Sequence, residues 1–408
     1  MDGEIKTMKC VILAAGEGKR MHPLTYTRPK VMLPIANKPI LEWNLLNAIQ
    51  AGIKEFIFVV GYKSEMVRNY FKDGSKWKTK IEYVNQGKPM GTAHAISMVE
   101  KFADDFIVLS GDTIFNQQDI KKIAEKENHM GIVKVKNPEE YGIVETKGKK
   151  IIKIYEKMDK PFTNIINAGI YHFTKNVFKN IKKTKKSPRG EYEITDTINM
   201  ITKEEGFFGL ELKHWRDVVY PWHLLDANEE ILKNQKKKNS GIIEKNTTLK
   251  GNVIIGENTT VMNGSYIEGP VIIGENCRIG PNCYIRPFTS IGNGCRVGNA
   301  CEVKNSIIMN NSNIPHQNYV GDSVIGENCN FGAGSKVANL RLDKKNIHVV
   351  LNGKKHNTNR KKLGVLLGDN SQTGINSMMD VGTIVGDNCF IGPGALVQGE
   401  IKPGSKIM

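Results

Sequence analysis

An aliphatic residue recurs every six positions through much of the second half of the chain. Glycine, asparagine and proline fill the intervals, as in IGENC, IGPNC and IGNGC, and they supply corner turns. A small or β-branched residue stands two positions before most of the aliphatic ones, so both point to the same side of a short strand. This period predicts a parallel β-helix whose coils have three six-residue edges. The aliphatic rungs are Ile243, Leu249, Ile255, Val261, Ile267, Ile273, Ile279, Ile285, Ile291, Val297 and Val303.

The six-residue pattern is interrupted twice. It breaks after Val303, and it breaks again before a lysine-rich stretch, 341–362, which we expect to be an excursion or loop. Insertions in solenoids form loops on one face, often the binding face, so these breaks are where we expect function. The rungs after the first break are Ile325, Phe331 and Val337, and those after the second are Leu367, Thr373, Met379, Val385, Ile391 and Val397.

The first half of the chain has a different rhythm. Residues 9–13 form an apolar run that leads into glycines, and a helical pattern follows over 41–51. Further apolar runs alternate with helical segments, which predicts an α/β three-layer domain with a mostly parallel sheet. Ligands of such a domain bind at the carboxyl ends of the strands. The further apolar runs are 56–60, 81–84 and 106–109.

These patterns predict an N-terminal α/β domain over 8–225, a helical linker over 226–240 and a β-helix over 241–408. A length of 408 residues suits two or three domains, each with its own core. No apolar run approaches the roughly 18 residues of a membrane span, and no apolar leader opens the chain. We therefore expect a cytoplasmic protein that makes no contact with a membrane.

The formal net charge is +16, and most of the cations are lysines dispersed along the chain. A nucleic-acid-binding protein more often clusters arginine with aromatic residues, so we expect no nucleic-acid partner. A positive field does help to collect phosphorylated substrates.

The cysteines follow the β-helix pattern. Six of the seven lie in the second half, and no CxxC pair is present, which argues against a metal site. Stacking of residue i on residue i+18 places Cys277 against Cys295 and Cys283 against Cys301. In a cytosolic protein we expect them to be unbridged core residues.

The segment LAAGEGKRM (13–21) follows the first predicted strand. Its glycines let backbone N–H groups approach a triphosphate, and Lys19 or Arg20 adds positive charge. A plain glycine turn after a strand is the alternative, because the segment lacks the spacing of a P-loop.

Companion segments extend this observation over 8–235. Together with LAAGEGKRM, the segments PLTYTRPK, MLPIANKPI, QGKPMGTAHAI, LSGDTIF, YGIVE, YEK, NAGIY, GEYEITD and WRDVVYPWHLL resemble the sugar-1-phosphate nucleotidylyltransferases. The resemblance implies that a sugar phosphate attacks the α-phosphorus of a metal-bound nucleoside triphosphate and that pyrophosphate leaves. Catalysis of this kind is positioning plus charge neutralisation.

The resemblance also assigns roles. Lys30 and Arg20 are the expected catalytic cations at the phosphates, and Asp112 and Asp217 are the expected Mg²⁺ ligands, which suits the preference of Mg²⁺ for carboxylates plus substrate phosphates. The expected nucleotide-binding residues are Leu13, Ala14, Gly16, Lys19, Gln86, Gly91 and Thr92, with Gln86 reading the base. The expected sugar-phosphate pocket is Gly142, Glu156, Lys157 and Asn167.

A second resemblance lies in the β-helix, whose six-residue pattern resembles the left-handed β-helix acyltransferases, which typically form trimers. Residues 313–339, NIPHQNYVGDSVIGENCNFGAGSKVAN, resemble the acetyltransferase segment of the bifunctional bacterial enzyme that acetylates glucosamine-1-phosphate and then uridylylates the product. The resemblance implies that His316 is the general base that takes a proton from the sugar amine as it attacks the acetyl-CoA thioester. Arg286 and Lys304, at 30 and 12 residues before His316, would bind the sugar phosphate, with Tyr319 and Asn330 beside them.

The chain departs from the bacterial pattern at Asn339-Leu340, where that family has Asn-Tyr. The acyl-donor side and the choice of amino sugar therefore stay open, as does UTP against dTTP.

The sequence thus predicts a member of the N-acetylglucosamine-1-phosphate uridylyltransferase/glucosamine-1-phosphate N-acetyltransferase family, a homotrimer that uses UTP, an amino-sugar-1-phosphate and acetyl-CoA with Mg²⁺. The alternative is a monofunctional glucose-1-phosphate uridylyl- or thymidylyltransferase with a structural or regulatory β-helix. The spacing of Arg286, Lys304 and His316 favours two activities, since a purely structural β-helix does not need it.

Overall fold

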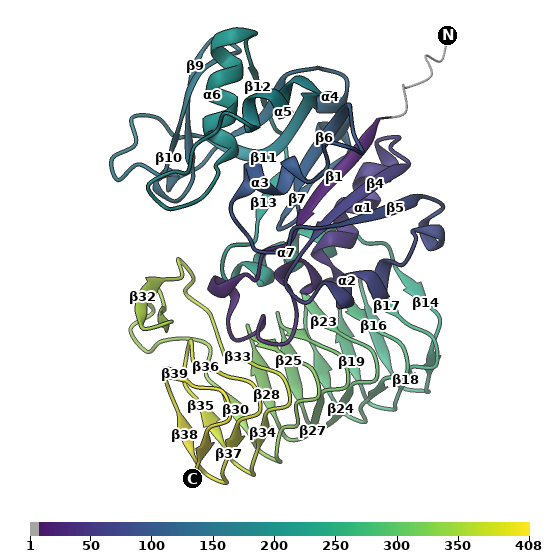
Figure 1. Ribbon diagram of the computed structural model, residues 1–408. Coiled ribbons are helices and arrows are strands. Elements are labelled where there is room, and N and C mark those ends of the chain that lie inside the picture. Colours follow the sequence, from purple (N-terminus) through teal and green to yellow (C-terminus); the bar gives the residue numbers. More distant parts are fainter. Residues whose placement is uncertain (1–7) are drawn as a thin grey trace. The chain divides into compact units, whose positions relative to one another are not determined.

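The computed structural model describes residues 8–408 (Figure 1). They divide into two compact units, one made of 8–17 with Ile40–Asp217 and the other of Gly18–Pro39 with Val218–Met408. Residues 1–7, at which we expected no leader, lie outside the described part. Within 8–408, none of the helices is long and apolar enough to cross a membrane.

The first unit is built on a nine-stranded sheet of order β5-β4-β1-β6-β11-β8-β12-β10-β9. Strands β5, β4, β1 and β6 are parallel, whereas β11 runs antiparallel to β6 and β8. The sheet is therefore parallel at one side and mixed at the other, rather than mostly parallel. The strands are β1 Lys9–Ala14, β4 Glu55–Val60, β5 Lys80–Asn85, β6 Asp105–Ser110, β8 His129–Lys134, β9 Gly142–Lys147, β10 Lys150–Glu156, β11 Ile165–Thr174 and β12 Phe208–Glu211.

Helices cover this sheet on two sides, which confirms the three-layer prediction. Val11 of β1 belongs to a core shared with α3, α5 and α6, while the equally buried Ile12 faces the other way because strand side chains alternate. Helices α1 and α4 pack on each other, and α1 packs on β7. The helices are α1 Ile40–Gln50, α2 Ser64–Phe71, α3 Thr92–Ser97, α4 Gln117–Ala124, α5 Asn176–Ile181 and α6 Ile194–Glu204, and β7 Thr113–Phe115 pairs with β13 Trp215–Asp217.

The second unit contains the predicted left-handed parallel β-helix (Figure 1). Its first face stacks β14-β17-β20-β23-β26-β29-β33-β36-β39, and its third face stacks β16-β19-β22-β25-β28-β30-β35-β38. The second face stacks β15-β18-β21-β24-β27 and continues as β34-β37-β40. The register of Val253 on Val271 and of Ile255 on Ile273 gives the expected 18-residue coil. The strands are β14 Lys238–Asn239, β15 Ile242–Ile243, β16 Thr248–Lys250, β17 Val253–Ile255, β18 Thr260–Val261, β19 Tyr266–Glu268, β20 Val271–Ile273, β21 Arg278–Ile279, β22 Tyr284–Ile285, β23 Thr289–Ile291, β24 Arg296–Asn299, β25 Glu302–Lys304, β26 Ile307–Ile308, β27 Asn313–His316, β28 Tyr319–Gly321, β29 Val324–Ile325, β30 Lys336–Val337, β33 Leu366–Leu367, β34 Gln372–Thr373, β35 Met378–Met379, β36 Ile384–Val385, β37 Phe390–Ile391, β38 Leu396–Val397, β39 Glu400–Ile401 and β40 Lys406–Ile407.

All seven cysteines are buried and free, which confirms the prediction made for Cys277, Cys283, Cys295 and Cys301. The thiols of the β-helix point into its core, where Cys277 and Cys283 donate to Gly292 O and Ser265 Oγ at 3.0 and 3.6 Å. Burial raises the pKa of the Cys283 thiol to about 11. These thiols are packing residues of the stack.

The prediction that the ladder breaks after Val303 is wrong. Ile308, Ile314 and Val320 continue the core without a gap, and each is at most 1 % exposed. The corner between the third and first faces is one residue shorter in two successive coils, so strands there pair at 17 residues, as Glu302 does with Tyr319. Because each shortened corner shifts the pattern by one residue, a strict six-residue count does not recognise Ile308, Ile314 and Val320 as core positions.

The second interruption is an insertion at the same corner of the next coil. The chain leaves after Asn339 and returns at Leu363, whose N–H donates to Asn339 O at 3.0 Å. Between them lies an antiparallel hairpin of β31 His348–Leu351 and β32 Lys354–Asn357. This confirms the expected excursion over 341–362.

Residues 18–39 pack with the β-helix. They include the hairpin of β2 Pro34–Ile35 and β3 Lys38–Pro39, beside which Asn37 Nδ2 donates to Ile291 O at 2.6 Å. Helix α7, His223–Lys233, joins them, because Asn228 bonds Ala36 N–H at 2.8 Å and Ser290 Oγ at 2.6 Å. The boundary expected between 225 and 226 falls inside this helix.

Candidate active sites

The glycine loop follows β1, and its residues divide between the two units. Leu13 and Ala14 end the strand, and Leu13 O accepts from Gly111 N–H at 3.0 Å, in the loop that carries Asp112. Gly16 is exposed, with no atom within 4 Å of where a Cβ would stand. An approaching phosphate therefore meets bare backbone at Gly16, as the loop chemistry requires.

Lys30 and the cations of the loop lie in the second unit. Gly18 has φ +77°, and a Cβ there would stand 2.7 Å from the Cβ of Lys30, so only glycine lets the loop approach this lysine. Lys30 opens the short helix η2, Lys30–Met32, and is 7 % exposed. Lys19 and Arg20 are exposed, and the Arg20 guanidinium lies 5.9 Å from the Tyr220 ring centroid.

Gln86 directly follows β5 and is 7 % exposed. Its Nε2 lies 3.3 Å from Gly91 O and 3.2 Å from His94 Nδ1, so both amide hydrogens are used and Oε1 is left to accept. An accepting oxygen suits the N3–H of uracil or thymine. Gly91 has φ +108°, and a Cβ at this position would stand 2.4 Å from Tyr192 O, so only glycine fits here. Thr92 Oγ1 accepts a hydrogen bond from Ile194 N–H at 3.0 Å.

The two expected metal ligands are brought together by the β7–β13 pair. Asp217 ends β13 opposite Thr113, and Asp112 is the residue just before Thr113. Within 8–408 no group of three or more His, Cys, Asp or Glu could hold a metal ion. Two carboxylates are a donor set that suits a cation taking its remaining ligands from substrate phosphates and water, as Mg²⁺ does.

Three of the four expected sugar-pocket residues converge in the first unit. Gly142 pairs with Glu156 across β9 and β10, and a Cβ on Gly142 would stand 3.4 Å from Glu156 Oε2 and 3.6 Å from Asn167 Cβ. Asn167 Nδ2 bonds the Tyr171 hydroxyl at 2.7 Å. Lys157 follows with φ +48°, a left-handed backbone that is uncommon for lysine and that collects at functional sites.

Sequence reasoning missed two charged residues beside this pocket. Arg189 Nη1 lies 2.9 Å from Glu156 Oε1 and 3.4 Å from Glu193 Oε1. Burial, with Glu156 nearby, raises the pKa of the Glu193 carboxyl. The signal was the GEYEITD segment (190–196), which contains Glu193 and directly follows Arg189, but its charged residues were not assigned roles.

In the β-helix, the shortened corners gather a polar network. Asp322 is 2 % exposed, and its carboxylate pairs with Lys304 Nζ at 3.1 Å. The same carboxylate accepts from Asn305 Nδ2 at 2.7 Å and from Asn339 Nδ2 at 2.6 Å. Asn339 Nδ2 also lies 3.1 Å from the Tyr319 hydroxyl. Lys304, Asp322 and Asn339 therefore lie at the same irregular corner of three successive coils, where Asp322 contacts both of the others.

Arg286 lies one coil before Lys304, at the same corner. Its Nη1 lies 2.8 Å from Glu302 Oε1, while its buried Nε has no hydrogen-bond partner within the described residues. Glu302 raises the pKa of the guanidinium. Arg286, Lys304 and Tyr319 thus lie on the same face of the β-helix. The Nε donor of Arg286 is therefore available to a ligand on that face.

His316 and Tyr319 lie on two sides of one corner. His316 ends β27, Asn313–His316, on the second face, and Tyr319 begins β28, Tyr319–Gly321, on the third. The His316 imidazole is exposed and makes no hydrogen bond within the described part of the chain. Asn330 lies on the second face, bridged to Asn313 and Gln372, and within the described residues no hydrogen bond joins its side chain to that of His316.

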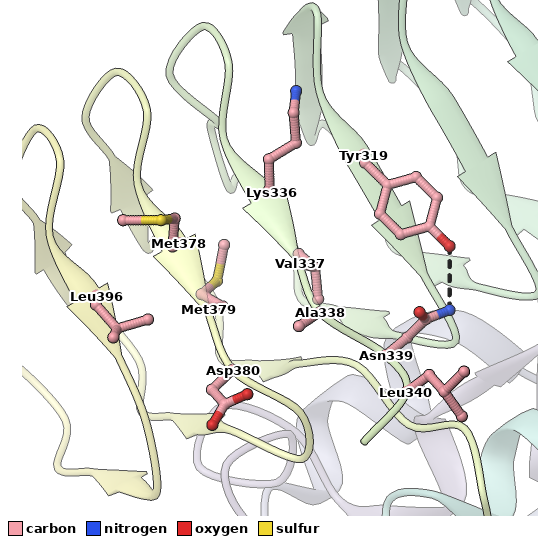
Figure 2. Close-up of a pocket in the computed structure, with 10 residues that line it drawn as sticks. All are labelled: Tyr319, Lys336, Val337, Ala338, Asn339, Leu340, Met378, Met379, Asp380 and Leu396. Atoms are coloured by element: carbon pink, nitrogen blue, oxygen red, sulfur yellow. Dashed lines mark hydrogen bonds between the residues drawn. The ribbon is translucent and has the colours of Figure 1, made fainter. Parts of the chain in front are cut away.

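A cavity of about 460 Å³ opens next to this network (Figure 2). Figure 2 shows Tyr319 and Asn339 bonded to each other at one end and Leu396 at the other. Its wall is mostly apolar, with Lys336 and Asp380 as the charged groups. The cavity is lined by Tyr319, Lys336, Val337, Ala338, Asn339, Leu340, Met378, Met379, Asp380 and Leu396.

Asp322 and the lining residues beyond Leu340 were not predicted. Asp322 was missed because it lies at a shortened corner, where the six-residue pattern of aliphatic positions does not apply. The residues of β35 and β38 follow the insertion, and only the fold brings them beside Tyr319.

Fold and geometry define the class: a nucleotidyltransferase domain with a β-helix that carries a second polar site. The Nucleotidyl transferase family model matches residues 9–234, and the GMPPB C-terminal domain model matches 267–402. A UDP-glucose pyrophosphorylase solved with UDP-glucose is similar over 56 % of this chain and 100 % of its own, with TM-score 0.52 and 23 % identity, which shows the fold alone.

Two relatives match nearly the whole chain. The "Bifunctional protein GlmU" of Methanocaldococcus jannaschii is 43 % identical, with 97 % of this chain and 96 % of the relative covered. The "Bifunctional sugar-1-phosphate nucleotidylyltransferase/acetyltransferase" of Sulfurisphaera tokodaii is 40 % identical, with 97 % and 99 % covered. The chain therefore belongs to the bifunctional sugar-1-phosphate nucleotidylyltransferase/acetyltransferase family and is an enzyme.

Proposed function

We propose that the β-helix transfers acetyl from acetyl-CoA to glucosamine-1-phosphate and that the N-terminal unit then joins N-acetylglucosamine-1-phosphate to UTP with release of pyrophosphate. The observation that carries the proposal is the network at the shortened corners, where Lys304, Asp322, Asn339 and Tyr319 meet beside a cavity. A β-helix that only supported another domain would not need a buried carboxylate with three donors at the one corner that breaks its own repeat.

In acetyl transfer, Arg286 and Lys304 hold the sugar phosphate, since both are cations on the third face. The sugar amine attacks the thioester carbonyl as an imidazole nitrogen of His316 accepts its proton. The C–N bond forms, the C–S bond breaks, and the thiolate of CoA takes up a proton. The apolar wall formed by Leu340, Met378 and Leu396 suits the pantetheine arm of the donor.

In nucleotidyl transfer, a phosphate oxygen of the sugar attacks the α-phosphorus of UTP, and the bond to pyrophosphate breaks. Lys30 and Arg20 neutralise the triphosphate, and Gln86 orients the base through its free Oε1. Asp112 and Asp217 would hold Mg²⁺, which supplies further charge neutralisation. The choice of UTP over dTTP and of the sugar rests with the residues around Gln86 and Glu156.

We further propose a cytoplasmic homotrimer. Free buried cysteines suit a reducing compartment. Phe390 is 51 % exposed on the last coils, outside the cavity, and a second copy of the chain would cover it within a closed symmetric assembly. Light scattering is expected to give three times 45.6 kDa, and a mass of 45.6 kDa would contradict the proposal.

The deciding experiment measures thiol release from acetyl-CoA with glucosamine-1-phosphate, and with galactosamine-1-phosphate in parallel. The parent protein is expected to release thiol, and His316→Ala is expected to lose about 10²–10⁴-fold of the rate. His348→Ala is the matched control, because His348 is an exposed histidine of the β31–β32 hairpin. Pyrophosphate release from UTP should persist in both variants and disappear in Lys30→Ala. No thiol release from the parent, with pyrophosphate release intact, would make the β-helix a structural domain.

A further inference from the structure

Lys30, the cation that we place at the triphosphate, is attached to the β-helix by its near neighbour Arg28. Arg28 is 3 % exposed, although arginine is almost never fully buried unless it is paired. Its guanidinium pairs with Asp369 through Nη2 and with Glu327 through Nη1 at 3.0 Å. Both carboxylates belong to the β-helix.

The two carboxylates lie on successive coils. Glu327 follows β29, Val324–Ile325, and Asp369 follows β33, Leu366–Leu367, and these strands are neighbours on the first face. The same two coils carry Asn330, Lys336 and Met378, which lie at or beside the acetyl site. Arg28 therefore binds across two of the coils that contribute to the second active site.

Asp369 is itself fixed in place. Its Oδ1 accepts from Glu327 N–H at 2.8 Å, its Oδ2 accepts from Thr27 Oγ1 at 2.6 Å, and its backbone N–H donates to Asp387 Oδ1 at 2.9 Å. Every oxygen of the carboxylate thus has a defined partner besides Arg28. A planar guanidinium fits such a pair of carboxylates better than a lysine ammonium does, because its donors are held in a fixed fork.

The link from Arg28 to Lys30 is short and stiff. Pro29 separates them, with φ −69°, and its carbonyl accepts from Met32 N–H at 2.9 Å in the first turn of η2. On its other side Lys30 meets Gly18 of the loop. Because this backbone is rigid, a shift of Arg28 would also move Lys30.

We infer that Arg28 is a positioning residue for nucleotidyl transfer, which holds Lys30 at the triphosphate by its ion pairs with Glu327 and Asp369 of the β-helix. The inference rests on the proposed role of Lys30 in uridylyl transfer. It makes the β-helix a working part of the first reaction as well as the carrier of the second. Arg28 itself touches no substrate.

The test uses the full chain with Arg28→Lys and Asp369→Asn. Both changes keep side-chain size close to the parent, and both weaken the fork. Pyrophosphate release from UTP and N-acetylglucosamine-1-phosphate is measured for kcat and KM, and thiol release from acetyl-CoA is measured on the same samples. Glu268→Gln is the matched control, because Glu268 pairs with Lys250 at 2.9 Å on an exposed part of the β-helix.

Each variant is expected to lose about 10–100-fold in kcat for pyrophosphate release, with KM for both substrates nearly unchanged, because a small misplacement of a charge costs the transition state more than the ground state. Acetyl transfer should be unchanged, and the two substitutions together should cost less than the product of their separate effects. Glu268→Gln should match the parent in both reactions.

Equal kcat in the parent and both variants would overturn the inference. So would a parallel loss of both activities with a lower melting temperature, since that would indicate a purely structural role. If Asp369→Asn fails to fold, Glu327→Gln, at the more exposed partner, replaces it. A parent that releases no pyrophosphate would refute the proposed function instead, so the two failures can be told apart.

Discussion

Phe331 is the large rung of the β-helix, and its truncation offers a direct test of how the coils are packed. The ring is fully buried, at 0 % exposed. It stacks between Ile314 of the preceding coil and Thr373 of the next, because Asn330 is bridged to Asn313 and to Gln372. The small Thr373 lies beside the large ring, so neither neighbour can fill the space that Phe331→Ala would leave.

A buried Phe→Ala change costs about 3–5 kcal/mol, the upper part applying where the site cannot collapse. For a unit of this length each kcal/mol lowers the melting temperature by about 2–4 °C, so we expect a fall of roughly 6–20 °C. Phe331→Leu keeps most of the volume and should cost under about 1.5 kcal/mol. Since the coils contact only their neighbours, the loss should appear first in the coils around the acetyl site.

The assay is calorimetry, together with the temperature at which each activity is lost. Thiol release from acetyl-CoA should fail in Phe331→Ala at a lower temperature than in the parent. Phe102→Ala, at a 43 % exposed ring in the first unit, is the control for deleting the same atoms without a buried cavity. A shift for Phe331→Ala no larger than that of Phe102→Ala would refute this account of the core.

Three further outcomes are expected. Burial raises the pKa of the Cys283 thiol to about 11, so a thiol reagent at pH 8 should label Cys283 only after the protein is unfolded, and rapid labelling of Cys283 in the native protein would contradict the packing. Burial also raises the pKa of Glu193 in the folded state, so its ionisation costs stability as pH rises through that value. Glu193→Gln should therefore melt higher than the parent at pH 8 and equally near pH 4, and a difference that is larger at pH 4 would have the wrong sign. In Asp322→Asn an amide nitrogen faces the donors of Lys304 and Asn339. Acetyl transfer and about 1–3 kcal/mol of stability should therefore be lost, while pyrophosphate release persists. Unchanged acetyl transfer would rule out this role for the network.

Much of the fold could be predicted because its periods are local. The six-residue repeat specified the β-helix, and the apolar runs specified β1, β4, β5 and β6 of the first unit. The prediction failed where the period changed. The corners at 304–306 and 321–323 are one residue shorter than the others, which moved the rungs by one residue, so Ile308, Ile314 and Val320 were lost from the count. A repeat can be recognised only while its phase is constant.

The candidate sites followed a similar division. The glycines, Lys30, Asp112 and the spacing of Arg286, Lys304 and His316 could be read from the chain, because motif residues keep a fixed order along it. Asp322, Arg189 and the cavity wall of Met378 and Leu396 could not, because each takes its role from a neighbour far away in sequence.

By itself, then, the sequence determined two kinds of domain and the positions of most chemical groups, because strand alternation, turn residues and motif spacing act over a few residues. Only the tertiary structure decided that residues 18–39 pack with the β-helix and that Arg28 pairs with carboxylates some 300 and more residues away. The physical reason is burial: a charged guanidinium in the interior needs partners, and any coil that presents carboxylates there can supply them, so nothing near Arg28 in the chain encodes which ones.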